Sequence, residues 1–502
     1  MARREYVSFL GERRRDVTFT NRGRDPGGWV LLVVAITGLA ISVWWFGFRE
    51  VDRVVAAERT LNDTTIPTLL TPAALEGSVE VSDVPLDCPN LVEEWTMFQG
   101  GGERTGCLST LPIVNPEILW ATQIGISGWR NNPVVDNGAI YVGSAGVVQF
   151  TADRRDGIYS LDLRTGVQRW RYQTELDVNS VAVSGGVVIG VGDEGRIWAL
   201  SARDGTLLWS DDLEVGVLGD PLILGDMVII GDGDGVVTAY DLDSGDQLWL
   251  DREPRLVGAI RGGASADGEH IYVATDLGEV ASINTAGQRA WKITLEPRDG
   301  GIARVYAAPT VTDTMLIISV VRDGEAAEPG FRALDKETGE ELWASQDKAS
   351  IKNQGWANVR SSPAIAGGYI IFGEGYSNQL VVIDLYTGDT LWAAETGEQC
   401  FPHWPSPAVN NSGGTVLAYL ARHDGGLYAV DLQTRTVAWK IYLGDAKGTG
   451  AFPQEFEEGS FCGWGPTVGH SILSSPAVAS NGVVVVGTLE GYIIAIGDAD
   501  WE

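Results

Sequence analysis

"DLYTGDTLW" (residues 384–392) is one copy of a nine-residue phrase that this chain repeats with small changes. Other copies are "DLRTGVQRW" (162–170), "DLDSGDQLW" (241–249) and "DKETGEELW" (335–343). Asp and Thr side chains can bond backbone groups of a turn, and Gly permits the positive φ that such a turn needs. The phrase therefore predicts a tight turn that leads into a Trp on the following strand.

The Trp at the end of the phrase sets the repeat length. It recurs at intervals of 39 to 52 residues, at Trp170, Trp209, Trp249, Trp291, Trp343, Trp392 and Trp439. A period of about 40–50 residues is typical of solenoids, propellers and arrays. Each unit holds four short apolar runs without helical spacing, as in "SSPAIAGGYIIFG" (361–373), "NQLVVIDL" (378–385) and "DTLWAAE" (389–395). Four short strands per unit predict a β-propeller blade.

The number of units predicts the number of blades. Eight units begin, at Pro133, Val183, Pro221, Ala264, Pro309, Pro363, Pro407 and Pro476. The eighth (474–496) ends before its fourth strand, whereas "PEILWATQ" (116–123), with Trp120, stands unassigned ahead of the first unit. We expect this segment to complete the eighth blade, because closing the ring with both ends of the chain removes exposed sheet edges. The predicted fold class is an all-β, eight-bladed propeller over residues 92–502, preceded by a single transmembrane helix.

The residues before the propeller divide into three parts. Residues 1–26 are an Arg-rich tail, and residues 27–48 contain no charge and are long enough to cross a bilayer core of about 30 Å. The Arg-rich flank predicts a cytoplasmic N-terminus and an exported propeller. A cleaved signal peptide is the alternative, for which "VVAAE" (54–58) offers a weak cleavage site. Residues 49–91, rich in Thr and Pro, are predicted to form an extended tether.

Charge and cysteine content limit the partners and the compartment. The net charge of −31 argues against nucleic acid, because phosphate binding needs clustered Lys and Arg. All four cysteines lie on the predicted exported side, at Cys88, Cys107, Cys400 and Cys462. An even number in an oxidising compartment indicates two disulfides. Three pairings are possible, and nearness in sequence favours Cys88–Cys107 with Cys400–Cys462.

The repeat resembles that of PQQ-type β-propellers, the family of quinoprotein dehydrogenases and BamB-like envelope assembly factors. The pattern A-x-D-x-x-T-G-x-x-x-W appears as "ALDKETGEELW" (333–343), "AYDLDSGDQLW" (239–249) and "VIDLYTGDTLW" (382–392), and "EWTMFQGGGERTG" (94–106) resembles the family's lead-in. "AVDLQTRTVAW" (429–439) loses the Gly. The resemblance implies that the indoles wedge between neighbouring blades, at Trp120, Trp170, Trp209, Trp249, Trp291, Trp343, Trp392 and Trp439.

The family also implies an enzymatic alternative, the oxidation of alcohols or sugars by bound PQQ with Ca²⁺. The chain has no adjacent Cys-Cys pair and no C-x-x-C-H haem motif, and no catalytic Asp can be assigned from a motif. "GVGDEG" (190–195) and "GDGDG" (231–235) lie between strands and are predicted to be hairpin turns, because a dinucleotide fingerprint must open a helix. The sequence thus predicts no catalytic, cofactor or metal residues.

Three long connections depart from the repeat, after Trp343, Trp392 and Trp439. They are rich in aromatic residues, and loops longer than about 12–15 residues are usually functional or disordered. We predict that they form a raised rim on one face of the ring, with the residues Trp356, Phe401, His403, Trp404, Phe452, Phe456, Phe461 and Trp464. The rim is either a binding surface or a plug of the central channel.

These observations favour a non-catalytic scaffold in the cell envelope, held in the cytoplasmic membrane by one helix and presenting the rim to a protein, peptide or glycan. A PQQ-dependent oxidoreductase is the alternative. The predicted membrane helix departs from the lipid anchor of BamB-like proteins, so a role in outer-membrane protein insertion does not follow from the resemblance.

Overall fold

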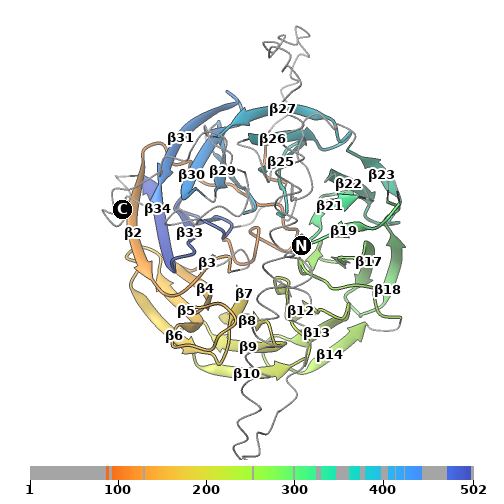
Figure 1. The fold of residues 1–502 in the computed structure, drawn as a ribbon, viewed down its shortest axis with the longest axis horizontal. Coiled ribbons are helices and arrows are strands. Elements are labelled where there is room, and N and C mark those ends of the chain that lie inside the picture. The colour runs from red at the N-terminus through yellow and green to blue at the C-terminus, as the bar shows by residue number, and fades with distance from the viewer. Residues whose placement is uncertain are drawn as a thin grey trace, which may run out of the picture. The chain divides into compact units, whose positions relative to one another are not determined.

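Eight β-sheets stand around a central axis in the computed structural model of the chain (Figure 1). The structure describes residues 86–89, 93–127, 131–251, 254–297, 300–323, 330–345, 361–373, 379–396, 405–412, 414–422, 424–443 and 472–498. The predicted membrane segment 27–48 lies outside these residues, and within them no helix is long and apolar enough to cross a membrane. The predicted all-β, eight-bladed propeller is confirmed.

The first four blades follow the chain in order, each as an antiparallel sheet with its first strand innermost. Blade 1 consists of β3 (Val134–Asp136), β4 (Ala139–Ala145), β5 (Asp156–Asp162) and β6 (Gln168–Gln173). Blade 2 consists of β7 (Val178–Ser184), β8 (Val187–Gly192), β9 (Arg196–Ser201) and β10 (Leu207–Asp212). Blade 3 consists of β11 (Leu222–Leu224), β12 (Met227–Gly231), β13 (Val237–Asp241) and β14 (Gln247–Asp251). Blade 4 consists of β15 (Ser265–Ala266), β16 (His270–Ala274), β17 (Glu279–Asn284) and β18 (Arg289–Thr294).

Blades 5 to 7 repeat this order, and two of them gain a short fifth strand. Blade 5 consists of β20 (Thr310–Val311), β21 (Met315–Asp323), β22 (Gly330–Asp335) and β23 (Glu341–Ala344), with β19 (Ala303–Val305) also paired to β21. Blade 6 consists of β24 (Ala364–Ala366), β25 (Tyr369–Gly373), β26 (Gln379–Asp384) and β27 (Thr390–Glu395). Blade 7 consists of β28 (Ala408–Ser412), β29 (Thr415–Ala421), β30 (Gly426–Asp431) and β31 (Thr436–Tyr442), with β1 (Cys107–Leu108) parallel to β28.

Blade 8 joins the two ends of the chain, as the sequence predicts. Its inner strands are β32 (Ala477–Val478), β33 (Val484–Gly487) and β34 (Tyr492–Asp498). Its outer strand is β2 (Pro116–Gln123), which pairs antiparallel with β34 and places Trp120 opposite Ala495. In Figure 1 the two segments, from opposite ends of the colour bar, lie side by side.

The position of a strand in its blade decides how much of it is buried. Every residue of β4, "AIYVGSA", is buried, whereas β10, "LLWSDD", is exposed at all positions but Trp209. A middle strand has a neighbouring blade on each face, so both of its faces must be apolar. An outer strand lies at the wall of the ring, so its residues alternate or are polar.

The repeated phrase forms the turn between the third and fourth strands. In blade 5, Oδ1 of Asp335 accepts hydrogen bonds from the N–H and the hydroxyl of Thr338, both at 2.8 Å. Gly339 follows with a φ of 75°. The Asp, Thr and Gly of the phrase therefore fix the turn, and the chain then enters the outer strand that carries the Trp.

Each phrase glycine also receives the indole of the preceding blade. A Cβ built on Gly388 would lie 2.4 Å from Trp343, and one on Gly245 would lie 2.6 Å from Trp209. Seven indoles donate Nε1–H to a backbone carbonyl at the next joint, from Trp120, Trp170, Trp209, Trp249, Trp291, Trp343 and Trp439 at 2.8–3.1 Å. Because only Gly leaves room for the ring, the same residue serves the turn and the joint.

The joint between blades 6 and 7 lacks the glycine. Arg435 occupies the position with a φ of 60°, and its guanidinium lies 5.8 Å from the ring centroid of Trp392. Nε1 of Trp392 is buried, with no hydrogen-bond acceptor among the described residues. Replacing Gly by a larger residue here thus exchanges the indole hydrogen bond for a cation–π contact.

Residues 95–110, which we call the hub segment, pass around the axis and contact the blades in turn. Six of its backbone carbonyls each accept a hydrogen bond from a backbone N–H group of a different blade. The pairs are Trp95 with Val135 of blade 1, Thr96 with Val183 of blade 2, Gly102 with Ala266 of blade 4, Glu103 with Val311 of blade 5, Thr105 with Ile365 of blade 6 and Gly106 with Val409 of blade 7. Thr110 donates to the carbonyl of Ser480 in blade 8. The hub segment therefore closes one end of the ring through backbone hydrogen bonds.

Arg104 anchors the hub segment from within. It is fully buried and donates to the carbonyls of Phe98, Pro221 and Ala264 at 2.8–3.1 Å, the latter two in blade 3 and just ahead of blade 4. Burial lowers the pKa of Arg104 to about 10, so the side chain remains charged at neutral pH. Three backbone carbonyls take the place of water around this charge.

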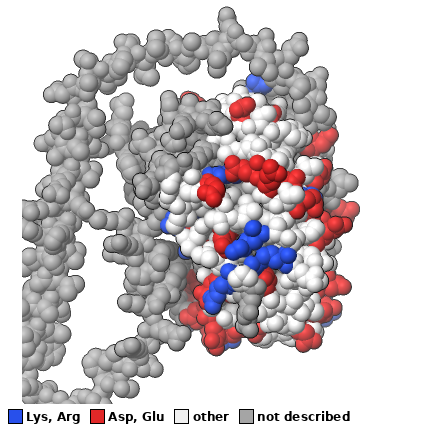
Figure 2. All heavy atoms as spheres, turned by 90° about the vertical axis from the view of Figure 1, so that its right-hand side faces the viewer, with Lys and Arg blue, Asp and Glu red and all other residues white. Residues whose placement is uncertain are grey.

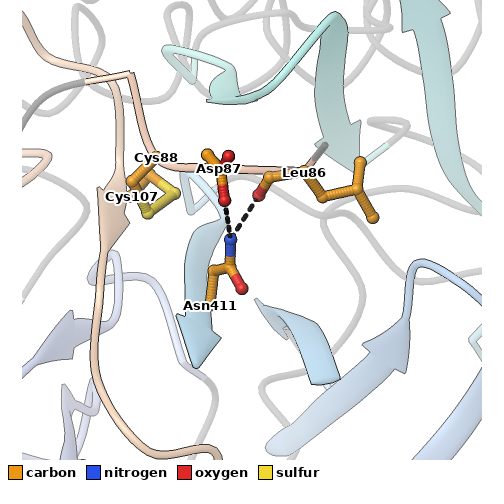
Figure 3. Close-up of a disulfide and its surroundings, with 5 residues drawn as sticks. All are labelled: Leu86, Asp87, Cys88, Cys107 and Asn411. Carbon is orange, nitrogen blue, oxygen red and sulfur yellow. Dashed lines mark hydrogen bonds between the residues drawn. A yellow bond between two sulfur atoms is a disulfide. The ribbon is translucent and has the colours of Figure 1, made fainter. Parts of the chain in front are cut away.

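The predicted Cys88–Cys107 disulfide is confirmed, and it joins the start of the propeller to β1 (Figure 3). Asn411 of β28 donates to the carbonyl of Leu86 at 2.7 Å and lies 3.4 Å from the carboxylate of Asp87. The chain that leads into the hub segment is therefore fixed to blade 7 by one covalent bond and by hydrogen bonds. Cys400 and Cys462 lie outside the described residues.

We expect Gly388→Ala to lower the free energy of unfolding by about 2–5 kcal/mol. A side chain in the left-handed region costs ~1–2 kcal/mol, and overlap with the packed indole of Trp343 costs a further ~1–3 kcal/mol. Gly225→Ala is the matched control, because Gly225 has a φ of 57° and nothing within 4 Å of the added Cβ. Urea unfolding followed by Trp fluorescence measures both, and equal losses in the two variants would show that the indole contact does not stabilise the ring.

Candidate functional site

The two ends of the ring differ in what they expose. The phrase turns and the hub segment lie at one end. We call the other end the loop face. Successive turns of an antiparallel sheet alternate between its two ends. The turns between second and third strands, and the connections from each outer strand to the next blade, therefore belong to the loop face. The eight predicted rim residues, Trp356, Phe401, His403, Trp404, Phe452, Phe456, Phe461 and Trp464, all lie outside the described residues.

The β4–β5 loop, residues 146–155 of blade 1, is the longest loop between a second and a third strand that the structure describes. It has ten residues, against three, five and four between the corresponding strands of blades 2, 3 and 4. Three apolar side chains at its tip are exposed, Val147 by 58%, Val148 by 56% and Phe150 by 51%. Phe150 has a φ of 63°, which is unusual for a bulky residue. We call these three side chains the loop tip.

Asp153 holds the first half of the loop. Its Oδ2 accepts hydrogen bonds from the N–H groups of Val147 at 2.5 Å and Val148 at 3.2 Å, and its Oδ1 accepts one from Arg155 at 2.6 Å. These bonds lower the pKa of the Asp153 carboxyl even though desolvation raises it. The two exposed valines therefore sit on backbone that a carboxylate fixes.

Asp177, just before β7 of blade 2, holds the second half. Its Oδ2 accepts a hydrogen bond from Phe150 N–H at 2.7 Å, so the loop of one blade is tied to the next. Asp177 is only 2% exposed. Burial above all raises the pKa of Asp177 to about 7, and the charges of Asp193, Asp156 and Asp153 add to the shift, although the bond from Phe150 opposes it.

Asp177 and its acidic neighbours Asp153, Asp156 and Asp193 form a carboxylate cluster, in which Asp177 is the residue that takes up a proton near neutral pH. Oδ1 of Asp177 and Oδ1 of Asp156 are buried, with no hydrogen-bond donor from the described residues. In the part of the chain that the structure describes, no three His, Cys, Asp or Glu side chains converge as metal ligands do. The group is therefore a source of local negative charge that weakens as Asp177 takes up a proton.

The Gly-rich motifs of blades 2 and 3 are hairpin turns. Residues 190–195 run from the end of β8 to the start of β9, and residues 231–235 lead from β12 toward β13. Oδ1 of Asp232 accepts hydrogen bonds from the N–H groups of Asp234 at 2.8 Å and Val236 at 2.9 Å. Asp232 therefore serves its own turn, whereas Asp193 accepts a hydrogen bond from the side chain of Asn179 at 2.7 Å.

A groove in the wall of the ring, between blades 4 and 5, is a second candidate site. A groove of about 530 Å³ is lined by Ile293, Leu295, Pro297 and the ion pair of Arg332 with Glu341, among others. Figure 2 shows this side of the wall, where Lys and Arg side chains gather among acidic ones. Ion pairs satisfy the basic residues there, such as Lys292 with Glu279 at 2.7 Å. Because the charged residues of its lining, Arg332 and Glu341, pair with each other, we regard the loop face as the stronger candidate.

The sequence prediction placed the binding face on blades 5 to 8 and missed the loop tip of blade 1. The sequence did contain a sign of this loop, in the unusual distance between two apolar runs. The run "GVVQFTADRR" (146–155) separates two apolar runs that only a few residues separate in the next blades. The role of Asp177 was not readable, because it depends on contact between loops of neighbouring blades.

Comparison with known proteins gives three findings. The family model described as "Outer membrane protein assembly factor BamB" matches residues 154–302 and 255–400. The BamB of Yersinia pestis is 25% identical over 322 residues, which cover 57% of this chain and 77% of that protein. The quinohemoprotein alcohol dehydrogenase ADH-IIG of Pseudomonas putida is 28% identical over 204 residues, 35% of this chain and 26% of that protein.

Among solved structures, BamB from Moraxella catarrhalis superposes with a TM-score of 0.54 at 16% identity. The superposition covers 77% of this chain and 99% of that one. At this identity the likeness concerns the fold.

We expect Asp177→Asn to raise the melting temperature at pH 8 by a few degrees and to leave it unchanged near pH 4. The pKa of Asp177 is raised to about 7 in the folded chain, so folding opposes its ionisation and the native state loses stability as the pH rises through 7. Asn keeps an acceptor for Phe150 N–H and removes the charge. Calorimetry from pH 4 to 8 measures the difference, and a variant that is less stable than the parent at pH 8 would contradict this account.

Proposed function

Because this chain is a PQQ-type β-propeller of the BamB-like family, we propose that it is a non-catalytic binding scaffold of the cell envelope. Its loop face presents a surface to a protein, peptide or glycan. The observation that carries the proposal is the β4–β5 loop, whose exposed apolar tip is held by two carboxylates, the partly exposed Asp153 of the loop itself and the buried Asp177 just ahead of blade 2.

The energetics of this loop support binding. Apolar side chains exposed on a rigid scaffold are a common feature of interaction sites, and binding residues are disproportionately found on loops positioned by such a scaffold. A loop that is already ordered loses little conformational freedom when a partner docks. The carboxylates that order it carry a desolvation cost, which is expressed in the raised pKa of Asp177. Stability of the ring alone does not require this arrangement.

The remaining features of the proposal come from the sequence. Residues 27–48 would anchor the chain in the cytoplasmic membrane, with residues 49–91 as a tether and the propeller on the extracytoplasmic side. The aromatic residues of the three long connections would extend the binding face over blades 5 to 8. We make no proposal that the chain assembles outer-membrane proteins, the process named in the descriptions of its BamB relatives.

A PQQ-dependent oxidoreductase is the second candidate. The similarity to a quinohemoprotein alcohol dehydrogenase of Pseudomonas putida favours it, over 35% of this chain. On the loop face, Asp153 and Asp232 bind backbone N–H groups of their own turns. Because these oxygens are already used, we rank the scaffold first.

Titration with PQQ and Ca²⁺ separates the two candidates. We expect the purified chain to show no rise in melting temperature and no reduction of an acceptor dye on a panel of alcohols and sugars. A cofactor-dependent rise together with substrate-dependent dye reduction would make the chain an enzyme and end the scaffold proposal.

The predicted rim has its own test. We expect the triple substitution Phe401→Ser, Trp404→Ser and Trp464→Ser to reduce partner binding strongly and to leave the melting temperature nearly unchanged. Removal of exposed aromatic anchors weakens an interface, whereas loss of a channel plug would remove buried apolar area. A large drop in melting temperature would therefore indicate the plug.

A further inference from the structure

We propose that the loop tip, formed by Val147, Val148 and Phe150, docks a protein segment that combines apolar side chains with Lys or Arg. The inference rests on the proposed scaffold function and names the chemistry of the partner. It concerns residues of blade 1, whereas the predicted rim belongs to the connections that follow Trp343, Trp392 and Trp439.

The backbone of the loop tip adopts an unfavourable conformation at Phe150. A bulky residue with positive φ is strained, and Phe150 holds this conformation while half of its surface faces solvent. Its N–H is bonded to Asp177, a carboxylate 2% exposed. Strained residues of this kind persist where the surroundings determine them, and they cluster at functional sites. The strained backbone of Phe150 and the buried carboxylate of Asp177 together hold one exposed Phe beside two exposed valines in a fixed arrangement.

The charge around the loop tip selects the partner. In residues 146–156, 171–177 and 193–194, Asp156 and Asp177 are buried, and four acidic side chains reach solvent, Asp153, Glu175, Asp193 and Glu194, against three basic ones, Arg154, Arg155 and Arg171. The guanidinium of Arg171 is used within the protein, by hydrogen bonds to the Arg154 carbonyl and Gln173 and by a contact of 5.2 Å with the Tyr159 ring. A Lys or Arg next to the apolar contact would meet complementary charge, which improves both association rate and specificity.

The same charge argues against a lipid surface. An apolar loop tip could enter a bilayer, but membrane-inserting surfaces use basic residues to approach anionic headgroups. This chain has a net charge of −31, and the sector of the loop tip is acidic. A cationic, apolar protein segment fits both properties of the site.

Fluorescence anisotropy with defined peptides tests the proposal on the full chain. The probes are three labelled 12-residue peptides, one of Leu and Lys, one of Leu and Glu and one of Ser and Lys. We expect the Leu–Lys peptide to bind at least about tenfold more tightly than the other two, because only it supplies both apolar contact and positive charge. Equal binding of all three, or tighter binding of the Leu–Glu peptide, would overturn the proposal.

Matched variants locate the contact. The triple substitution Val147→Ser, Val148→Ser and Phe150→Ser should weaken the Leu–Lys peptide about tenfold or more. Leu207→Ser with Leu208→Ser is the control, because these side chains are exposed by 40% and 48% on the outer strand β10. A photoreactive residue at position 149 should cross-link to the same peptide.

The outcomes separate this inference from the proposed function. Peptide binding that the loop-tip variant leaves intact would overturn the inference, and the scaffold proposal would then depend on the rim alone. Binding of anionic or zwitterionic vesicles that the loop-tip variant abolishes, without peptide binding, would replace the protein segment by a membrane. Turnover with PQQ would end the scaffold proposal whatever the peptide result.

Discussion

The contact of an indole with a glycine, made at six of the eight blade joints, is the interaction on which the ring depends. A blade is only four short strands, and its middle strands are apolar on both faces, so it cannot exist without neighbours. The phrase Asp-x-x-Thr-Gly places a glycine where the preceding Trp lies flat against backbone and reaches a carbonyl. The joint between blades 6 and 7, where Arg435 replaces the glycine, retains the ring contact and loses the hydrogen bond. Where the glycine is present, one phrase thus sets both the turn and the contact between neighbouring blades.

The ring is closed in two ways that involve different parts of the chain. At the wall, β2 from the N-terminal side completes the sheet of β34 from the C-terminal side. At the axis, the hub segment bonds to the blades in their order around the ring. Both closures use residues that precede the first blade, so the ring is complete only when the two ends of the chain have met. The loop face remains as the end at which sequence can vary without breaking a joint.

The sequence predicted those features that depend on repetition. Eight blades, the closing strand 116–123 and the Cys88–Cys107 pairing follow from spacing, and the structure agrees. The path of the hub segment was not predictable, because its contacts are made by backbone carbonyls that leave no residue pattern. The loop tip was missed for a related reason, since Asp177 and Phe150 lie on different blades and meet only in the folded ring. The predicted rim remains a prediction, as its residues lie outside the described part of the chain.

The Cys88–Cys107 disulfide also has a mechanical meaning. Everything ahead of Cys88 is connected to the ring by two covalent routes, the backbone through residues 89–106 and the bond between the sulfur atoms. Tension applied from the N-terminal side takes the shorter route, through Cys107 into β1 and from there by shear into β28. The intervening stretch of the hub segment, which carries Arg104 and seals the axis, stays slack while the disulfide bears the force. The bond therefore works as a strain relief, and a pull on the chain ahead of Cys88 does not unthread the centre of the propeller.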